Sequence, residues 1–176
     1  MMSRTMTEAQ IPKRVDGGKL VDVNQQLTGQ IDASKLTRLS AATLRSDTPV
    51  SCNLEFDRDI ERHRVLKGDC STSVVMTCQR CLGEVTLAIS SNFELGLVFN
   101  DEQAKQLPKR LEPAELTEDG LLDLWEIIED EVLLSLPDFP MHPADECSAD
   151  LPEQEETNAD VKRPNPFEVL AQLKQK

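Results

Sequence analysis

Residues 71–99 read STSVVMT, CQRCLG and EVTLAISSNFELGLVF, which are two strand-like runs joined by a short turn. Apolar and polar side chains alternate over 85–99, which is typical of a strand with one buried face. The turn carries Cys78 and Cys81, whose spacing lets both thiols point at one ion or at each other. This stretch therefore predicts two neighbouring strands with a pair of thiols at one corner of a sheet.

Upstream, two further segments alternate in the same way and predict half-buried strands at 21–32 and 50–57, with a short helix between them. A third strand is expected over 66–77. Because glycine interrupts strands, we expect a bulge or turn near Gly68.

Downstream, Asp123 and Glu126 form a capping box that opens the main helix, which we expect over 123–136, before Pro137. Its apolar residues form a wide stripe, so the helix should pack across the sheet. Its acidic residues are assigned to the solvent-facing side: Glu126, Glu129, Asp130 and Glu131.

The expected architecture is α+β, with an antiparallel sheet of four or more strands, able to curl toward a barrel, covered by one main helix. A disordered start at 1–10 precedes a single α+β domain at 11–147. An acidic disordered linker at 148–164 and a short C-terminal helix at 165–176 complete the chain.

Charge is distributed very unevenly along the chain. Residues 1–110 have a balance of +1, residues 111–161 carry 17 acidic side chains without a Lys or Arg, and residues 162–176 have a balance of +3. A contiguous acidic block repels phosphates and attracts basic partners. The alternative is an ordinary solvated helix face followed by a flexible loop.

The composition favours a cytoplasmic protein, since the sequence contains neither a membrane-spanning apolar run nor the apolar core of an export signal. Five cysteines is an odd number. We therefore expect thiols or metal ligands rather than a disulfide framework.

A zinc site is the first chemical hypothesis. Zinc takes four nitrogen or sulfur ligands in a tetrahedron, and the sequence offers Cys78, Cys81, His142 and Cys147. The second pair lies about 60 residues downstream, so tertiary folding has to bring it close. The alternative is that the thiols belong to the turn or the core and that the histidine lies at the surface.

A thiol–disulfide function at the same two cysteines is a weaker hypothesis, because redox motifs normally begin a helix and this motif joins two strands. Other enzymatic chemistry is not expected either. The sequence lacks a glycine-rich phosphate loop, a Gly-x-Ser-x-Gly elbow and a His-Glu-x-x-His motif, and it holds only two histidines.

Nucleic-acid contacts are a further hypothesis. The candidates are basic residues beside the second and third strands and in the cysteine turn, which we expect to share one end of the sheet: Arg58, Arg62, Arg64, Lys67 and Arg80. Stacking aromatics should be scarce, because Phe93 and Phe99 fall on the buried parity. Interspersed acidic residues leave ordinary surface charge as the alternative.

Several blocks resemble the bacterial YceD family, described as large ribosomal RNA subunit accumulation proteins. The similar blocks are LKGD at 66–69, CQRCL at 78–82, residues 120–137, residues 142–147, and NPFEVLAQLK at 165–174. The blocks occur in the same order as in the family, and the resemblance as a whole spans most of the chain, from about Ile11 to the terminus.

This resemblance implies a non-enzymatic role in the synthesis, processing or stability of 23S rRNA and in assembly of the large ribosomal subunit. The implied partners are 23S rRNA or its precursor, a basic large-subunit ribosomal protein, or both, with no membrane and no small-molecule substrate. The family's cysteine pattern has invited a metal-binding suggestion. The alternative function is an RNA-independent acidic module, stabilised by zinc, that binds a basic ribosomal protein.

Overall fold

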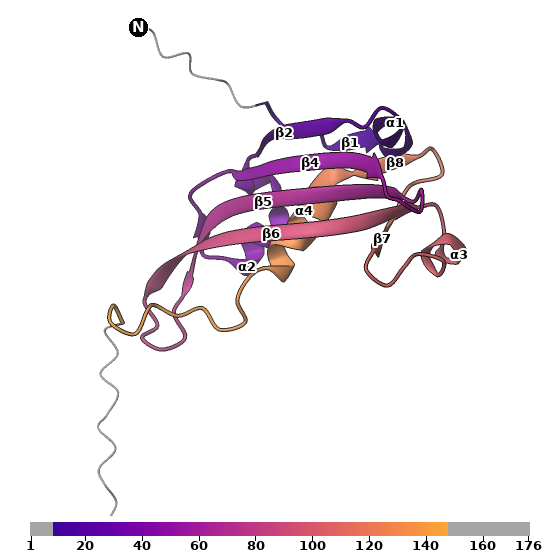
Figure 1. The fold of residues 1–176 in the computed structure, drawn as a ribbon. Helices are drawn as coiled ribbons and strands as arrows, with labels where there is room; N and C mark the ends of the chain where they lie inside the picture. Colours follow the sequence, from indigo (N-terminus) through magenta and orange to yellow (C-terminus); the bar gives the residue numbers. More distant parts are fainter. Residues whose placement is uncertain (1–8, 148–176) are drawn as a thin grey trace, which may run out of the picture.

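The computed structural model describes residues 9–147, in which one large sheet carries helices on one face (Figure 1). The chain passes in order through β1 (Arg14–Asp16), α1 (Gly17–Asp22), β2 (Gln26–Ile31), a short 3₁₀ helix (Ala33–Lys35), α2 (Thr37–Ala42), β3 (Arg45–Ser46), β4 (Val50–Arg58), β5 (Arg64–Thr77), β6 (Glu84–Val98), α3 (Asp101–Ala104), β7 (Glu112–Glu115), β8 (Leu121–Asp123) and α4 (Leu124–Leu134).

Strands β2, β4, β5, β6 and β7 lie side by side in that order, and β3 pairs with β5 beyond the end of β4. All neighbours in this sheet are antiparallel except β6 and β7, which are parallel. Strands β1 and β8 pair separately. The predicted α+β fold with an antiparallel sheet of four or more strands is confirmed, and within residues 9–147 the sheet stays open rather than closing into a barrel.

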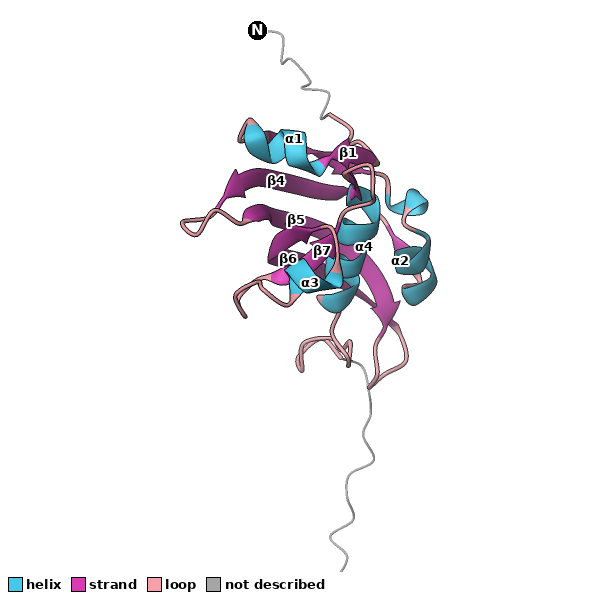
Figure 2. Cartoon of the chain, turned by 90° about the vertical axis from the view of Figure 1, so that its right-hand side faces the viewer, coloured by secondary structure: helices cyan, strands magenta, loops and turns pink. Residues whose placement is uncertain are grey.

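Helix α4 covers the inner face of the sheet, with α2 beside it (Figure 2). The period of two in β4 places alternate side chains in the core, as the sequence predicted for this strand: Val50, Cys52, Leu54 and Phe56. From the helix side, α4 buries Leu124, Ile128 and Val132. The predicted N-cap at Asp123 is also confirmed, because Asp123 Oδ1 accepts from the backbone N–H of Glu126 at 3.2 Å.

The predicted interruption of the third strand near Gly68 is wrong. Strand β5 pairs without a break with β4 on one side and with β6 on the other. Gly68 instead makes room for an aromatic ring, since a Cβ at this position would lie 2.0 Å from the Phe93 ring. A strand glycine thus marks a close packing contact rather than a bulge.

The first predicted strand is only partly correct. Residues 26–31 form β2, but Gly17–Asp22 form α1, which begins where Asp16 Oδ1 accepts from the Lys19 N–H at 3.0 Å. Val21 is buried and Val23 is 66% exposed. Two valines separated by one residue resemble a strand, but here they lie at the end of a helix and just beyond it.

The assignment of Glu129 to the solvent-facing side is wrong. Its side chain is buried and caps α2, whose own N-terminal residue Leu36 provides no side-chain cap. Glu129 Oε1 accepts from the backbone N–H groups of Arg38 at 2.7 Å and Leu39 at 3.1 Å. Its Oε2 accepts from the Arg38 guanidinium at 3.1 Å. This carboxylate therefore ties α4 to α2.

No helix in residues 9–147 combines the length and the apolar character that crossing a membrane requires. The predicted acidic linker at 148–164 and the predicted helix at 165–176 lie outside the described residues, as does most of the predicted disordered start.

Candidate functional site

The 78–83 turn between β5 and β6 lies at one extreme of the sheet (Figure 1). The Cys78 N–H donates to the Gly83 carbonyl at 2.8 Å, and the Leu82 N–H donates to the Cys78 carbonyl at 2.9 Å. Leu82 adopts a left-handed conformation with φ of 59°. These hydrogen bonds make the turn tight and place the sulfur of Cys81 beside that of Cys78.

The segment after α4 returns to this turn. The Gln79 N–H donates to the Pro140 carbonyl at 2.8 Å, which fixes the backbone of the returning segment. His142 Nε2 lies 2.9 Å from the Glu84 carbonyl at the start of β6. Tertiary folding therefore brings His142 and Cys147 to the two cysteines of the turn.

The four side chains form one cluster of possible metal ligands. Their ligand atoms all lie within 4.8 Å of one another, with 4.0 Å between the sulfurs of Cys78 and Cys147 and 3.4 Å between Cys81 Sγ and His142 Nδ1. Tetrahedral zinc with ordinary bond lengths would require about 3.8 Å between two sulfurs and about 3.6 Å between sulfur and nitrogen. These two separations lie within about 0.2 Å of the values for zinc, so the residue types and their spacing suit this ion.

The histidine is oriented for this role. A carbonyl can only accept, so the 2.9 Å contact to Glu84 requires the proton of His142 to sit on Nε2. Nδ1 then directs its lone pair toward Cys81 Sγ. Metal-ligating histidines commonly donate their second nitrogen to a carbonyl in this way.

The protein environment shifts the pKa values of the two turn thiols in opposite directions. Burial opposes ionisation of Cys78, but backbone N–H groups of Cys81, His142 and Arg80 outweigh it and lower the pKa of Cys78 to about 5. For Cys81, the N–H of Gly83 favours the thiolate, while burial and the neighbouring sulfurs of Cys78 and Cys147 prevail and raise the pKa. Hydrogen bonds thus stabilise a negative charge within the cluster.

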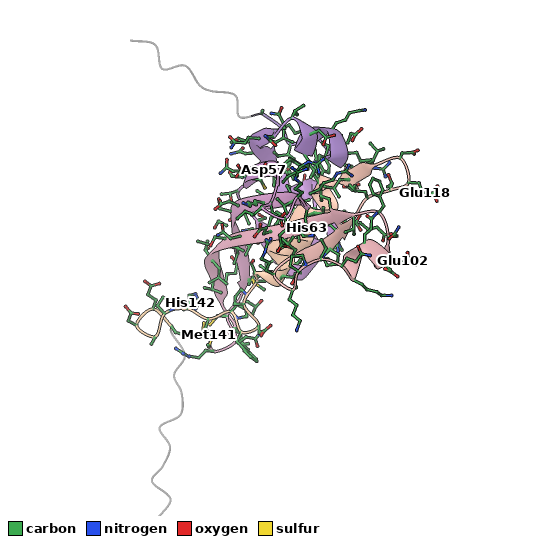
Figure 3. All side chains as sticks on the ribbon, turned by 45° about the vertical axis from the view of Figure 1, so that its right-hand side comes forward. Asp57, His63, Glu102, Glu118, Met141 and His142 are labelled. Carbon is green, nitrogen blue, oxygen red and sulfur yellow. The ribbon has the colours of Figure 1, made fainter. Side chains whose placement is uncertain are left out.

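The five predicted phosphate contacts do not share one end of the sheet, so that expectation was wrong. The 59–63 loop joins β4 to β5 and the 78–83 turn joins β5 to β6, so they lie at opposite ends of β5. The 14 residues of this strand span 13 steps of about 3.3 Å each, which separates the two loops by about 43 Å. Figure 3 shows His63 and His142 in these two places. Arg80 is therefore remote from the other candidates.

The remaining candidates near the 59–63 loop have different surroundings. Arg58 pairs with Asp22 at 2.6 Å, and Arg62 occupies a left-handed position with φ of 69°. Arg64 places its guanidinium 5.9 Å from the centroid of the Phe99 ring. Lys67 lies on the outer face of the sheet.

Phe99 was expected to be buried and is instead 39% exposed. It follows the last residue of β6, Val98, so the alternation that governs the strand no longer fixes its direction. An aromatic ring that could stack on a base thus lies beside Arg64.

A second cluster of titratable groups holds the 59–63 loop in place. Asp59 Oδ2 lies 2.9 Å from His63 Nδ1 and 2.6 Å from Arg110 Nη2, so the carboxylate joins the loop to the segment before β7. Burial opposes its ionisation, but hydrogen bonds from the His63 side chain and backbone and from Arg110 outweigh that effect. The pKa of Asp59 falls from 3.8 to about 2.

This lowered pKa predicts a specific acid sensitivity. A carboxyl whose folded-state pKa is depressed stabilises the protein above its unfolded-state pKa of 3.8, and this stability is lost as the pH falls toward about 2. We expect Asp59→Asn to be less stable near neutral pH and to lose less stability between about pH 5 and pH 2. Urea unfolding across this range measures both effects.

The matched control is Asp119→Asn, which removes an exposed carboxylate from another loop and should keep the wild-type pH profile. Equal acid sensitivity of wild type and Asp59→Asn would contradict the assigned role of Asp59.

Two features, one at the cysteine–histidine cluster and one in the acidic block, could not be predicted from residue types. The Glu84 carbonyl is a backbone group, so no residue type could have revealed it. The separation of the acidic block into a buried cap, Glu129, and a set of partly exposed carboxylates also depends on neighbours distant in the chain. The only local indication of the exposed carboxylates was the absence of Lys and Arg over 111–161.

Comparison with known proteins gives one consistent result. A family model described as "Large ribosomal RNA subunit accumulation protein YceD" matches residues 66–174. A curated protein with the same description from Haemophilus influenzae is 34% identical over 177 residues, covering 97% of this chain and 100% of the relative. No solved structure gives a significant match.

Proposed function

The chain belongs to the YceD family, and from this premise we propose that it acts in the accumulation of large-subunit ribosomal RNA, through the synthesis, processing or stability of 23S rRNA. The observation that carries the proposal is the similarity over nearly the whole chain to a relative described as a large ribosomal RNA subunit accumulation protein. The proposed mode of action is binding without turnover of a substrate, in the cytoplasm.

For direct contact with rRNA, the end of the sheet at the 59–63 loop is a better candidate than the end at the 78–83 turn. Arg62 and Arg64 flank this end, and the exposed Phe99 lies beside Arg64. Arginine side chains can contact phosphates while an aromatic ring stacks on an unpaired base. Arg58, Lys67 and Arg80 would add separate contacts with the rRNA. The contact made by Arg80 would lie far from the others, at the opposite end of β5.

Zinc is the proposed cofactor, held by Cys78, Cys81, His142 and Cys147. Four protein ligands leave no open coordination position, so the ion would be structural. The ligands would fasten the segment after α4 to the 78–83 turn.

The function is tested by deleting the gene and measuring 23S relative to 16S rRNA during cold and rich growth. We expect the ratio to fall and a plasmid copy of the wild-type gene to restore it. An unchanged ratio would rule out the proposed function.

The same assay can test the proposed rRNA contacts, using Arg62→Gln with Arg64→Gln. The matched control removes two basic charges elsewhere, Lys35→Gln with Arg45→Gln. Complementation should fail selectively for the first pair. Full complementation by the first pair would reject these contacts while leaving the role in rRNA accumulation intact.

A second candidate function is an RNA-independent module that binds a basic large-subunit ribosomal protein. The long acidic block, without a Lys or Arg over 111–161, favours it. Co-purification with and without nuclease separates the two functions, since protein partners survive nuclease only if RNA does not bridge them.

A further inference from the structure

A groove of about 630 Å³ lies between the edge strand β7 and helix α4. Figure 2 shows these two elements next to each other. The apolar residues that line the groove include Ala114, Leu122, Ile127, Leu133 and Leu134. Leu134 is 77% exposed, so a large apolar side chain faces solvent at the end of α4. Such a side chain in a groove is a typical anchor for a protein partner.

Among residues 9–147, the rest of the lining is strongly acidic and contains no Lys or Arg. Its six carboxylates belong to Glu112, Glu115, Asp123, Glu126, Asp130 and Glu131. Two are paired, Asp123 with Arg14 and Asp130 with Arg38. Within the described residues the other four form no ion pair.

Burial and nearby carboxylates act together on the pKa of Glu131. Burial first, and then repulsion from Glu112 and Asp130, raises the pKa of this half-buried carboxyl. The groove therefore holds negative charge that no cation of the described residues neutralises.

We propose that the β7–α4 groove binds a basic amphipathic helix of a protein partner. Apolar residues on one face of such a helix would contact Ile127 and Leu134, while its Lys or Arg residues would reach the four unpaired carboxylates. Helix α4 has 11 residues and is about 16 Å long, which matches three turns of a partner helix. The proposal deepens the protein-binding side of the proposed function by locating the surface and the chemistry of the partner.

Charge and backbone chemistry disfavour three other occupants of the groove: RNA, a second copy of this chain and an added β-strand. RNA would place phosphates against carboxylates, and a second copy of this groove would place carboxylates against carboxylates. An added strand along β7 meets Pro113, which has no N–H to donate, in a strand of only four residues. A helix satisfies its own backbone and needs only the side-chain contacts that the groove offers.

The test uses the purified full chain and a labelled synthetic helix of about 15 residues with leucines on one face and lysines elsewhere. Fluorescence anisotropy should show saturable binding that weakens as salt is raised. A peptide with glutamates in place of the lysines, and one with serines in place of the leucines, should both bind at least roughly tenfold more weakly.

Variants of the protein locate the binding. Glu112→Gln with Glu131→Gln removes two groove charges, and Leu134→Ser removes an exposed apolar anchor; each should weaken binding roughly tenfold. Glu55→Gln with Glu102→Gln removes the same charge outside the groove and should retain the affinity. Equal binding to the groove and control variants would overturn the proposal.

Other occupants give distinct results. Tighter binding of a peptide of residues 162–176 than of the basic model helix would assign the groove to this chain's own basic end. A dimer that the groove variants dissociate would assign it to a second copy, and preferred binding of an RNA oligonucleotide would assign it to RNA. Each result would overturn the proposal. Because the assay contains no ribosomes, its failure would leave the role in rRNA accumulation standing.

Discussion

Replacement of Cys78 by serine should strongly weaken zinc binding by the purified protein. Wild-type protein prepared without chelator should carry about one zinc per chain, because four nitrogen and sulfur ligand atoms lie within 4.8 Å of one another and zinc prefers such ligands. A hydroxyl in place of one thiolate is a much poorer zinc ligand. We therefore expect zinc affinity to fall by more than about 100-fold.

Loss of zinc should strongly destabilise one part of the molecule and leave the rest nearly unchanged. Structural zinc contributes on the order of 10 kcal/mol in small peptides that cannot fold without it. Here the core under α4 is independent of the cluster, so loss of zinc should mainly release the 78–83 turn and the 137–147 segment. Amide hydrogen exchange, compared with and without chelator, should show the change in these two segments.

Controls distinguish ligation from general damage. His63→Ala removes the only other histidine and should retain zinc, whereas His142→Ala should lose it. His142→Cys replaces one zinc ligand by another and should restore binding. Protein that contains no metal and has the same stability with and without EDTA would contradict the proposed centre.

Glu129→Ala is expected to lower the free energy of unfolding by about 3 kcal/mol. The buried carboxylate accepts from two backbone N–H groups at the start of α2 and from the Arg38 guanidinium. Alanine leaves these N–H groups without their acceptor and separates α2 from α4. Urea unfolding monitored by the fluorescence of Trp125, the single tryptophan of the chain, which lies in α4 with Glu129, measures the loss.

Two matched variants interpret this result. Glu129→Gln keeps an acceptor while removing the charge, so it should lose only about 1 kcal/mol. Glu126→Ala removes an exposed carboxylate from the same helix and should change stability by no more than about 0.5 kcal/mol. If Glu129→Ala resembled Glu126→Ala, the tertiary cap would not be a main source of stability.

Much of the fold could be predicted from local patterns. The alternation in 50–57 and 85–99 predicted β4 and β6 closely, because a strand buried on one face repeats every two residues. The start of α4 was predicted from Asp123 for an equally local reason, since the cap bonds only three residues away. The candidate zinc ligands were identified from residue type, and their metal binding remains a prediction.

Patterns that have two physical causes were misleading. Gly68 could mark a bulge or a close contact, and only the position of the Phe93 ring across the pair decided between them. Val21 and Val23 have the spacing of a strand, although Val21 lies in the last turn of α1 and Val23 directly follows that helix. At Gly68 the deciding atoms belong to Phe93, a neighbour that the local sequence does not specify, whereas α1 begins with a local cap in which Asp16 accepts from the Lys19 N–H.

The sequence by itself determined which face of each main strand is buried and where α4 begins, and it supplied the candidate zinc ligands, whose metal binding remains a prediction. Only the tertiary structure decided that His142 and Cys147 return to the 78–83 turn, that Arg80 is remote from Arg62, and that Glu129 is buried. The physical reason is range: periodicity and capping depend on residues a few positions apart. Ligand clusters, buried charges and grooves depend on contacts between segments 60 to 90 residues apart, such as those joining Cys81 to His142 and Leu39 to Glu129.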